Sequence, residues 1–252
     1  MPTYEQILKW WKDKEIANSA DLETALNGYL INFAYHSGKI ENDNITFYDT
    51  REVFEHDGVT SYTGDLRTLF EINNAKEASL LVLDLFEEKK PIDETMVKQV
   101  QWQLTKGTYD PRRYKKGERP GEFKKHDYVT GQHEVGAAPK DVPIELNELL
   151  EDITDNGDDK HALVIAAFFH AKFENIHPFS DGNGRTGRLL MNYLLVLHNH
   201  PPIVIHEEDR KQYYKALEAW DEKQELEPMK RFLKDQVVKT WEKQYERGNS
   251  QA

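Results

Sequence analysis

Cysteine is absent from this 252-residue chain. The absence excludes disulfide bonds and every metal site built from thiolates. Long apolar runs are missing too, because the longest stretches, such as 162–170, are far too short to span a bilayer. The N-terminus has no basic stretch followed by an apolar one, so no signal peptide is predicted. We therefore expect a soluble, cytoplasmic protein with no membrane partner.

Positive charge is also scarce. The 45 acidic residues outnumber the 33 basic ones, which gives a net charge of −12 and an isoelectric point near 5.3. Non-specific nucleic-acid binding needs a cationic field, so no nucleic-acid partner is expected. A polyanionic ligand would have to be met by a local basic cluster. Hydrophobic residues make up 38% of the chain, enough for the packed core of one large domain.

Apolar residues recur at three- and four-residue spacing along most of the chain, which predicts helices. The predicted helices cover 4–16, 21–36, 63–87, 93–104, 143–154, 158–173, a stretch ending near 197, 207–224 and 227–245. Between them, 37–58 is polar, and 123–135 is typical of a β-hairpin. We expect an all-α fold with one small hairpin. Helices in 1–62 should pack on a core at 63–252 to form one globular unit.

The densest set of reactive groups runs from His177 to Arg188, with the sequence His-Pro-Phe-Ser-Asp-Gly-Asn-Gly-Arg-Thr-Gly-Arg. Gly182 and Gly184 can take backbone angles closed to other residues, and they let a phosphate approach the backbone. Successive amides in such a turn form an anion nest. The helix that follows points its N-terminus at the same spot. The segment therefore predicts a phosphate-binding turn.

Charged side chains surround that turn. Arg185 and Arg188 lie three residues apart, so both guanidiniums fall on one helix face and can hold separate phosphates. Asp181 is an oxygen ligand of the kind that Mg²⁺ prefers. His177 titrates near neutrality and could take a proton from an attacking hydroxyl. A glycine-rich helix start with two surface arginines and a buried histidine would explain each residue singly, but not the whole set.

The segment resembles the Fic family, whose motif reads His-Pro-Phe-x-Asp/Glu-Gly-Asn-Gly-Arg-x-x-Arg, and every specified position is present. The resemblance implies an all-α core and a protein adenylyltransferase. Such an enzyme moves AMP from ATP to a Ser, Thr or Tyr hydroxyl of a target protein, and self-modification is also expected. Residues 123–135 would form the family's flap, which holds the target chain. Gly184 separates the chain from the Doc-type kinases, which carry a lysine there.

The resemblance also implies roles by position. His177 would be the general base for the target hydroxyl, and Asp181 would hold Mg²⁺ across the α- and β-phosphates of ATP. Such chemistry needs in-line positioning and charge stabilisation more than covalent help from the protein.

The remaining motif residues would bind the phosphates. Asn183, with the amides around Gly182 and Gly184, would cradle the α- and β-phosphates. Arg185 would bind the β-phosphate and Arg188 the γ-phosphate. ATP is thus the expected co-substrate and Mg²⁺ the expected cofactor.

Residues 37–42, Ser-Gly-Lys-Ile-Glu-Asn, fit the family's inhibitory pattern Ser/Thr-x-x-x-Glu-Gly/Asn. By this resemblance Glu41 would pair with Arg188 and force ATP into an unproductive pose, with Ser37 opening the motif. The other interpretation is a helix end, with Ser37 near its terminus and Glu41 on a solvated surface.

Two further groups are candidates for nucleotide contact. The turn of the predicted hairpin supplies Thr130, Gly131, Gln132 and His133. They could touch the nucleotide or the target, or only face solvent. Tyr213 and Tyr214 fall where many family members have an aromatic pair at the nucleotide. We expect one of the two to pack inward. Whether the other faces the adenine or ribose of the nucleotide is left open.

Two other functions fit the same residues. The site could remove AMP from a modified protein, with Glu41 aligning a water molecule. It could also be a non-catalytic nucleotide-sensing module, although a sensor has no need of the base His177. A homodimer that buries part of the N-terminal helices is a further expectation.

Overall fold

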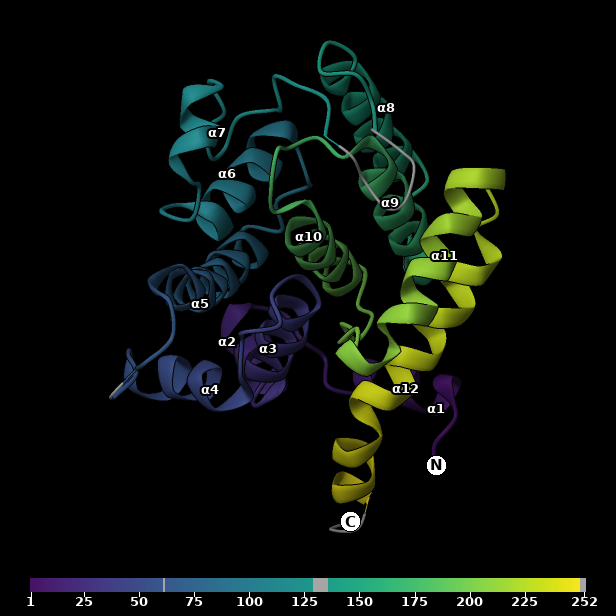
Figure 1. The fold of residues 1–252 in the computed structure, drawn as a ribbon. Helices are drawn as coiled ribbons and strands as arrows, with labels where there is room; N and C mark the ends of the chain where they lie inside the picture. Colours follow the sequence, from purple (N-terminus) through teal and green to yellow (C-terminus); the bar gives the residue numbers. More distant parts are fainter. Residues whose placement is uncertain (61, 129–135, 250–252) are drawn as a thin grey trace.

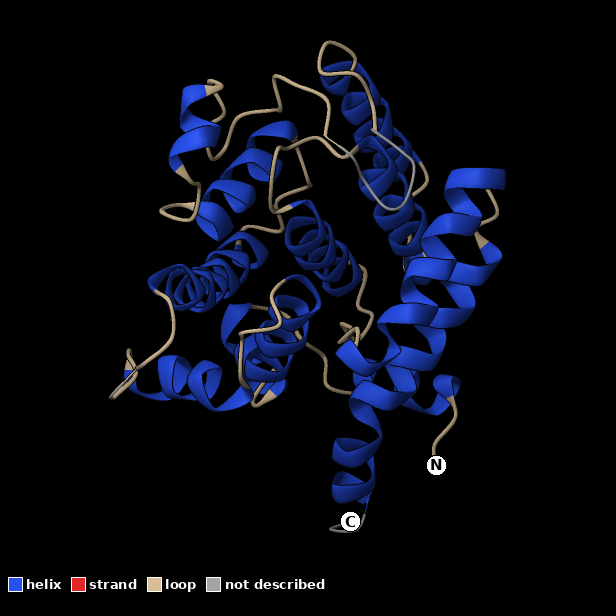
Figure 2. Ribbon diagram, viewed as in Figure 1, coloured by secondary structure: helices blue, strands red, loops and turns tan. Residues whose placement is uncertain are grey.

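The structure is a computed structural model that describes residues 1–60, 62–128 and 136–249. Within these ranges the chain forms α-helices, one 3₁₀ turn and no strand (Figures 1 and 2). The first helices are α1 (Tyr4–Lys12), α2 (Ser19–Ala25), α3 (Tyr29–Glu41), α4 (Phe47–His56), α5 (Leu66–Glu87) and α6 (Glu94–Thr105). They are followed by α7 (Pro111–Lys115), α8 (Val142–Asp155), α9 (Ala162–Ile176), α10 (Asn183–Leu197), η1 (Glu207–Asp209), α11 (Arg210–Lys223) and α12 (Glu227–Asn249).

The all-α prediction is confirmed for the described residues, but the small hairpin is not seen. Residues 123–128 form no strand, and 129–135 lie outside the described part of the chain. Two backbone bonds tie the ends of this segment to the bend after α9. The Lys124 N–H donates to the Pro178 carbonyl at 2.9 Å, and the Ala137 N–H donates to the Ile176 carbonyl at 3.0 Å. These backbone groups therefore bond to a distant loop rather than to a partner strand.

The predicted helix at 21–36 is wrong in its bounds, because a glycine divides it. Gly28 has φ +75°, a left-handed conformation that stops α2 and lets the chain turn into α3. From Tyr29 the helix runs on to Glu41, beyond the expected end at 36. The polar segment 37–58, for which no helix is predicted, contains α4, whose first turn is capped by the Thr46 hydroxyl.

Helix α10 lies in the middle of the bundle (Figure 1). It packs against α9, α6, α3 and α5, and nearly all of its residues are buried. A helix buried on every side has to satisfy each polar side chain inside the protein. Asn192 illustrates this, because its amide donates to the Ile203 carbonyl at 2.8 Å and accepts the Ile203 N–H at 2.6 Å.

The N-terminal helices pack on the rest of the chain. Helix α1 lies against α12, where the Trp11 and Trp241 rings are 5.1 Å apart, and α3 lies against α5 and α10. The indole N–H of Trp241 donates to the Pro202 carbonyl at 2.7 Å, and Tyr29 stacks on its ring. A unit boundary at 62 stays a prediction. No helix in the described ranges is both long and apolar enough to cross a lipid bilayer.

Trp241 is fully buried, so Trp241→Ala removes aromatic packing and a hydrogen bond at once. We expect the free energy of unfolding to fall by about 3–5 kcal/mol in urea titrations. The control is Trp102→Ala, at a tryptophan that is 47% exposed, where the loss should stay below about 1 kcal/mol. Equal losses in the two variants would contradict the packing described for α1 and α12.

Candidate active site

The loop between α9 and α10 holds the predicted phosphate-binding turn. It begins at His177 and ends at Gly182, both in the left-handed conformation, with φ +50° and +82°. No described side chain caps the start of α10, so its first N–H groups are open to a ligand. A Cβ at Gly182 would lie 2.5 Å from Cγ2 of Thr105, so glycine is required by space as well as by φ.

The Asn183 side chain closes this loop from within. Its oxygen accepts the Phe179 N–H at 2.8 Å, and its nitrogen donates to the Phe179 carbonyl at 2.8 Å. Phe179 itself is fully buried and anchors the turn. Because both ends of the Asn183 amide are used, this side chain fixes the shape of the loop.

The imidazole of His177 is half-buried beside the loop. Burial and, to a lesser extent, the ammonium of Lys124 lower the pKa of His177 to about 4. Three influences raise this pKa: the charge of Glu41, a hydrogen bond with the backbone of Glu174, and the charge of Asp181. The ring is therefore neutral at physiological pH and is able to accept a proton.

Three arginines from three helices converge on Asp181. The guanidiniums of Arg67, Arg113 and Arg185 lie 3.2, 3.5 and 3.5 Å from its carboxylate oxygens. Arg67 is itself oriented by Glu71, one turn later on α5, at 3.0 Å. This is the local basic cluster that a polyanion would need in an acidic protein. Neither Arg67 nor Arg113 was singled out from the sequence, although Arg113 belongs to its conspicuous basic run at 112–116.

The donors present fit a metal that is shared with a nucleotide. Among the described residues there is no group of three or more His, Asp or Glu side chains that could hold a metal ion alone. Asp181 is a single, partly exposed carboxylate at the start of the phosphate cradle. Mg²⁺ commonly binds through one or two carboxylates plus substrate phosphates, which matches such a site.

Helix α3 brings the predicted inhibitory residues to Arg188. The Arg188 guanidinium donates to the Ser37 hydroxyl at 3.0 Å, to the Ser37 carbonyl at 2.9 Å and to Glu41 at 2.8 Å. The arginine side chain is 2% exposed and that of Glu41 is 37% exposed. The expected Glu41–Arg188 pair is thus formed, with one partner enclosed and the other reachable from solvent.

The two tyrosines have different environments. Tyr213 is buried, and its hydroxyl lies 2.8 Å from Nε2 of His170 and 3.4 Å from the Arg188 guanidinium. Tyr214 is 43% exposed and remains available to a ligand. The other candidate group, Thr130, Gly131, Gln132 and His133, lies outside the described residues.

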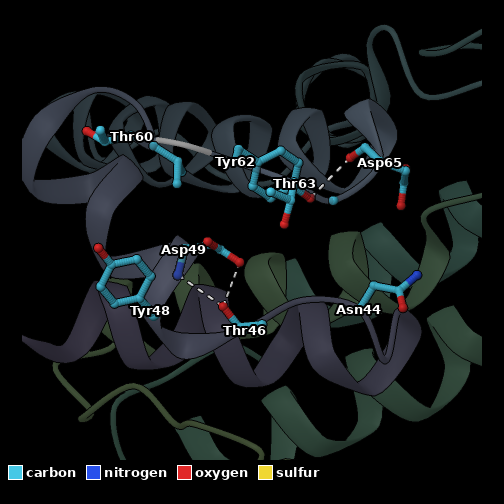
Figure 3. Close-up of a pocket in the computed structure, with 10 residues that line it drawn as sticks. Asn44, Thr46, Tyr48, Asp49, Thr60, Tyr62, Thr63 and Asp65 are labelled. Atoms are coloured by element: carbon cyan, nitrogen blue, oxygen red, sulfur yellow. Dashed lines mark hydrogen bonds between the residues drawn. The ribbon is translucent and has the colours of Figure 1, made fainter.

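A hollow of about 430 Å³ lies elsewhere, between α4 and the chain leading into α5 (Figure 3). Its lining includes Asn44, Thr46, Tyr48, Asp49, Thr60, Tyr62, Thr63 and Asp65. Several of these groups bond to each other or to the nearby backbone, as Thr46 does to Asp49 at 2.7 Å and Tyr62 to the Asp65 carbonyl at 3.1 Å. No residue of 177–188 lines this hollow, so it is separate from the candidate active site.

Comparison with known proteins agrees with this geometry. A model of the Fic/DOC family matches residues 91–195, which include α6, α9, the loop at 177–182 and most of α10. Residues 91–195 therefore form a domain of the Fic/DOC family.

Relatives of known name extend the likeness beyond that domain. Protein adenylyltransferase Fic of Drosophila virilis is 33% identical over 228 residues, which is 89% of this chain and 44% of the relative. The protein of the same name from Aedes aegypti is 32% identical over 224 residues, 87% of this chain and 42% of the relative. The chain thus spans less than half the length of these relatives.

Solved structures show the same fold. A Fic domain containing signaling protein from Bacteroides thetaiotaomicron superposes with a TM-score of 0.79 at 23% identity, over 94% of this chain and 93% of that one. Fic-1 from C. elegans gives a TM-score of 0.75 at 21% identity, over 99% and 74%. Both likenesses cover nearly the whole of this chain.

Asn183→Leu keeps a similar volume but leaves the buried Phe179 N–H and carbonyl without partners. We expect a loss of about 2–4 kcal/mol in the free energy of unfolding, from the cost of unsatisfied buried groups. The control is Asn147→Leu, at an exposed residue of α8 that bonds only to Glu151, where the change should be within about 0.5 kcal/mol. A harmless Asn183→Leu would mean that the loop does not depend on this amide.

Proposed function

We propose that this protein transfers AMP from ATP to a Ser, Thr or Tyr hydroxyl of a target protein, and that it also modifies itself. The observation that supports the proposal most is the neutral imidazole of His177 beside the uncapped N-terminus of α10. A base and an anion cradle at one loop are what attack on a nucleotide phosphate requires. The names of the relatives, protein adenylyltransferase Fic, support the same chemistry.

In this proposal His177 takes the proton of the target hydroxyl as its oxygen attacks the α-phosphorus and pyrophosphate leaves. Gly182 and Gly184 let the phosphates approach the amides at the start of α10, which Asn183 holds in shape. Arg185 binds the β-phosphate. Asp181 would hold Mg²⁺, whose charge neutralises the phosphate oxygens.

The chain near Lys124 is proposed to hold the target. Its backbone bond to Pro178 keeps this segment against the loop that carries His177. A target chain lying along 123–128 would have its hydroxyl close to the imidazole. Tyr214, half-exposed on α11, is the proposed aromatic contact for the nucleotide.

Glu41 is proposed to inhibit the enzyme. The γ-phosphate needs Arg188, and this guanidinium is already bound by Glu41 and Ser37. An ion pair with one enclosed partner is strong, yet the exposed carboxylate can be displaced. The second candidate function is removal of AMP from a modified protein. The partly exposed carboxylate of Glu41 supports it, because such a group could align the attacking water.

Glu41→Gly should raise AMP transfer by about tenfold or more, since loss of a coupling of 1–3 kcal/mol changes an equilibrium by roughly 5–150-fold. The measurement is label from α-labelled ATP in the protein, confirmed by intact mass. The control is Asp43→Ala, which removes an exposed acid just after α3 that pairs only with Arg210 among described side chains. Transfer at the wild-type level in Glu41→Gly would contradict the inhibitory role.

His177→Ala, made together with Glu41→Gly, should keep ATP binding and lose about 10²–10⁴-fold in transfer rate. His161→Ala, at a surface histidine, is the matched control.

Because the pKa of His177 is lowered to about 4, its base form persists as pH falls. At saturating ATP the rate should therefore not drop between about pH 8 and about pH 5.5 through protonation of this ring. A rate that halves near pH 6.5 would contradict the lowered pKa of His177, while the loss of transfer in His177→Ala tests its role as the base.

A further inference from the structure

Two glycines on α10 make room for two carboxyl groups. Gly184 and Gly187 lie three residues apart on one helix face. A Cβ at Gly184 would collide with Oε1 of Glu41, and a Cβ at Gly187 would lie 2.7 Å from Oε1 of Glu174. Glu41 comes from α3 and Glu174 from α9. Carboxyl groups of two helices therefore lie against the turn of α10 that precedes Arg188.

Arg188 needs a negative partner in every state of the protein. Its guanidinium is enclosed, and a guanidinium does not give up its proton. When Glu41 leaves, the positive charge would stay buried without compensation, which is strongly unfavourable. Ser37 and Tyr213 supply only neutral acceptors. Glu174 is the other acid whose field reaches this guanidinium.

Glu174 is held as a neutral acid while Glu41 is in place. Its Oε1 is buried and has no hydrogen-bond partner among the described residues. Burial raises the pKa of Glu174 to about 8, Arg188 acts to lower it, and Glu41 and Asp221 raise it. Loss of Glu41 removes one of the influences that raise this pKa, while Arg188 still lowers it, so the carboxyl then ionises more easily.

The other groups around Glu174 cannot take this role. Besides Arg188 and Glu41, the ionisable groups that face it come from α9, the following loop and α11: His170, His177, Tyr213, Tyr214 and Asp221. Burial lowers the pKa of His170 to about 3 and raises that of Tyr213, so both are neutral. Asp221 is engaged by the Asn175 amide at 2.9 Å.

We propose that Glu174 is the reserve counter-ion of Arg188, a positioning residue that is protonated while Glu41 occupies the guanidinium. It releases its proton to solvent when Glu41 leaves, and takes one back when a polyphosphate arrives. This inference rests on the proposed function, since the polyphosphate is that of ATP. Its consequence is that ATP binding to the released enzyme takes up a proton, and therefore weakens as pH rises.

The test uses two full-length proteins that carry His177→Ala to prevent turnover. One also carries Glu41→Gly, and the other carries Glu41→Gly with Glu174→Gln, in which glutamine imitates the protonated acid. Mg²⁺-ATP is titrated by calorimetry at about pH 7.5 in two buffers of different ionisation enthalpy. We expect the protein with Glu174 to take up about 0.5–1 more proton per ATP than the Gln protein.

Each outcome decides a different point. Binding by both proteins with equal proton uptake overturns the role of Glu174 and leaves the proposed function standing. No ATP binding by either overturns the proposed function and this inference with it. If the Gln protein does not fold, the Glu174 protein alone decides. Its Kd should weaken by up to about tenfold per pH unit between about pH 6.5 and about pH 8.5, and a flat Kd overturns the inference.

Discussion

The buried positive charge of Arg188 is the constraint on which the rest of this structure depends. A guanidinium inside a central helix has to be paired, and here α3, α9 and α11 all turn polar groups toward it. The same charge is the natural partner of a phosphate. In the proposed function, inhibition and phosphate binding therefore compete for one group, and the side chain of Glu41 reaches solvent, where a phosphate can displace it.

The loop before α10 shows how much geometry a short sequence can encode. Left-handed residues at both ends turn the chain, and Asn183 ties the turn to Phe179. The first N–H groups of the helix are left free as a result. Helices α5, α6 and α7 then support the loop from one side, through Arg67, the Gln101 amide on the Asp181 carbonyl, and Arg113. The uncapped helix start thus lies beside a dense basic cluster within an acidic protein.

Periodicity predicted the presence of most helices, and the helix predicted at 93–104 agrees closely with α6, which Asp93 caps. The errors have local causes. Gly28 divides one predicted helix, because only a positive φ reverses the chain there. Helix α4 was missed, because its apolar face is small and its sequence is polar. No hairpin strand forms at 123–128, where Lys124 bonds to the loop at Pro178 rather than to a neighbouring strand.

The sequence by itself determined the turn at 177–188, because glycines, asparagine and the helix start act over a few residues of the same chain. It also named the Glu41–Arg188 pair through a resemblance. Only the tertiary structure decided which groups join that pair. Arg67 and Arg113 reach Asp181, and Glu174 lies against Gly187, next to Arg188 in the chain, through the packing of α5, α7 and α9 around α10. Such contacts join helices that are far apart in the chain. They depend on how buried faces fit together, and no local pattern of residues records that fit.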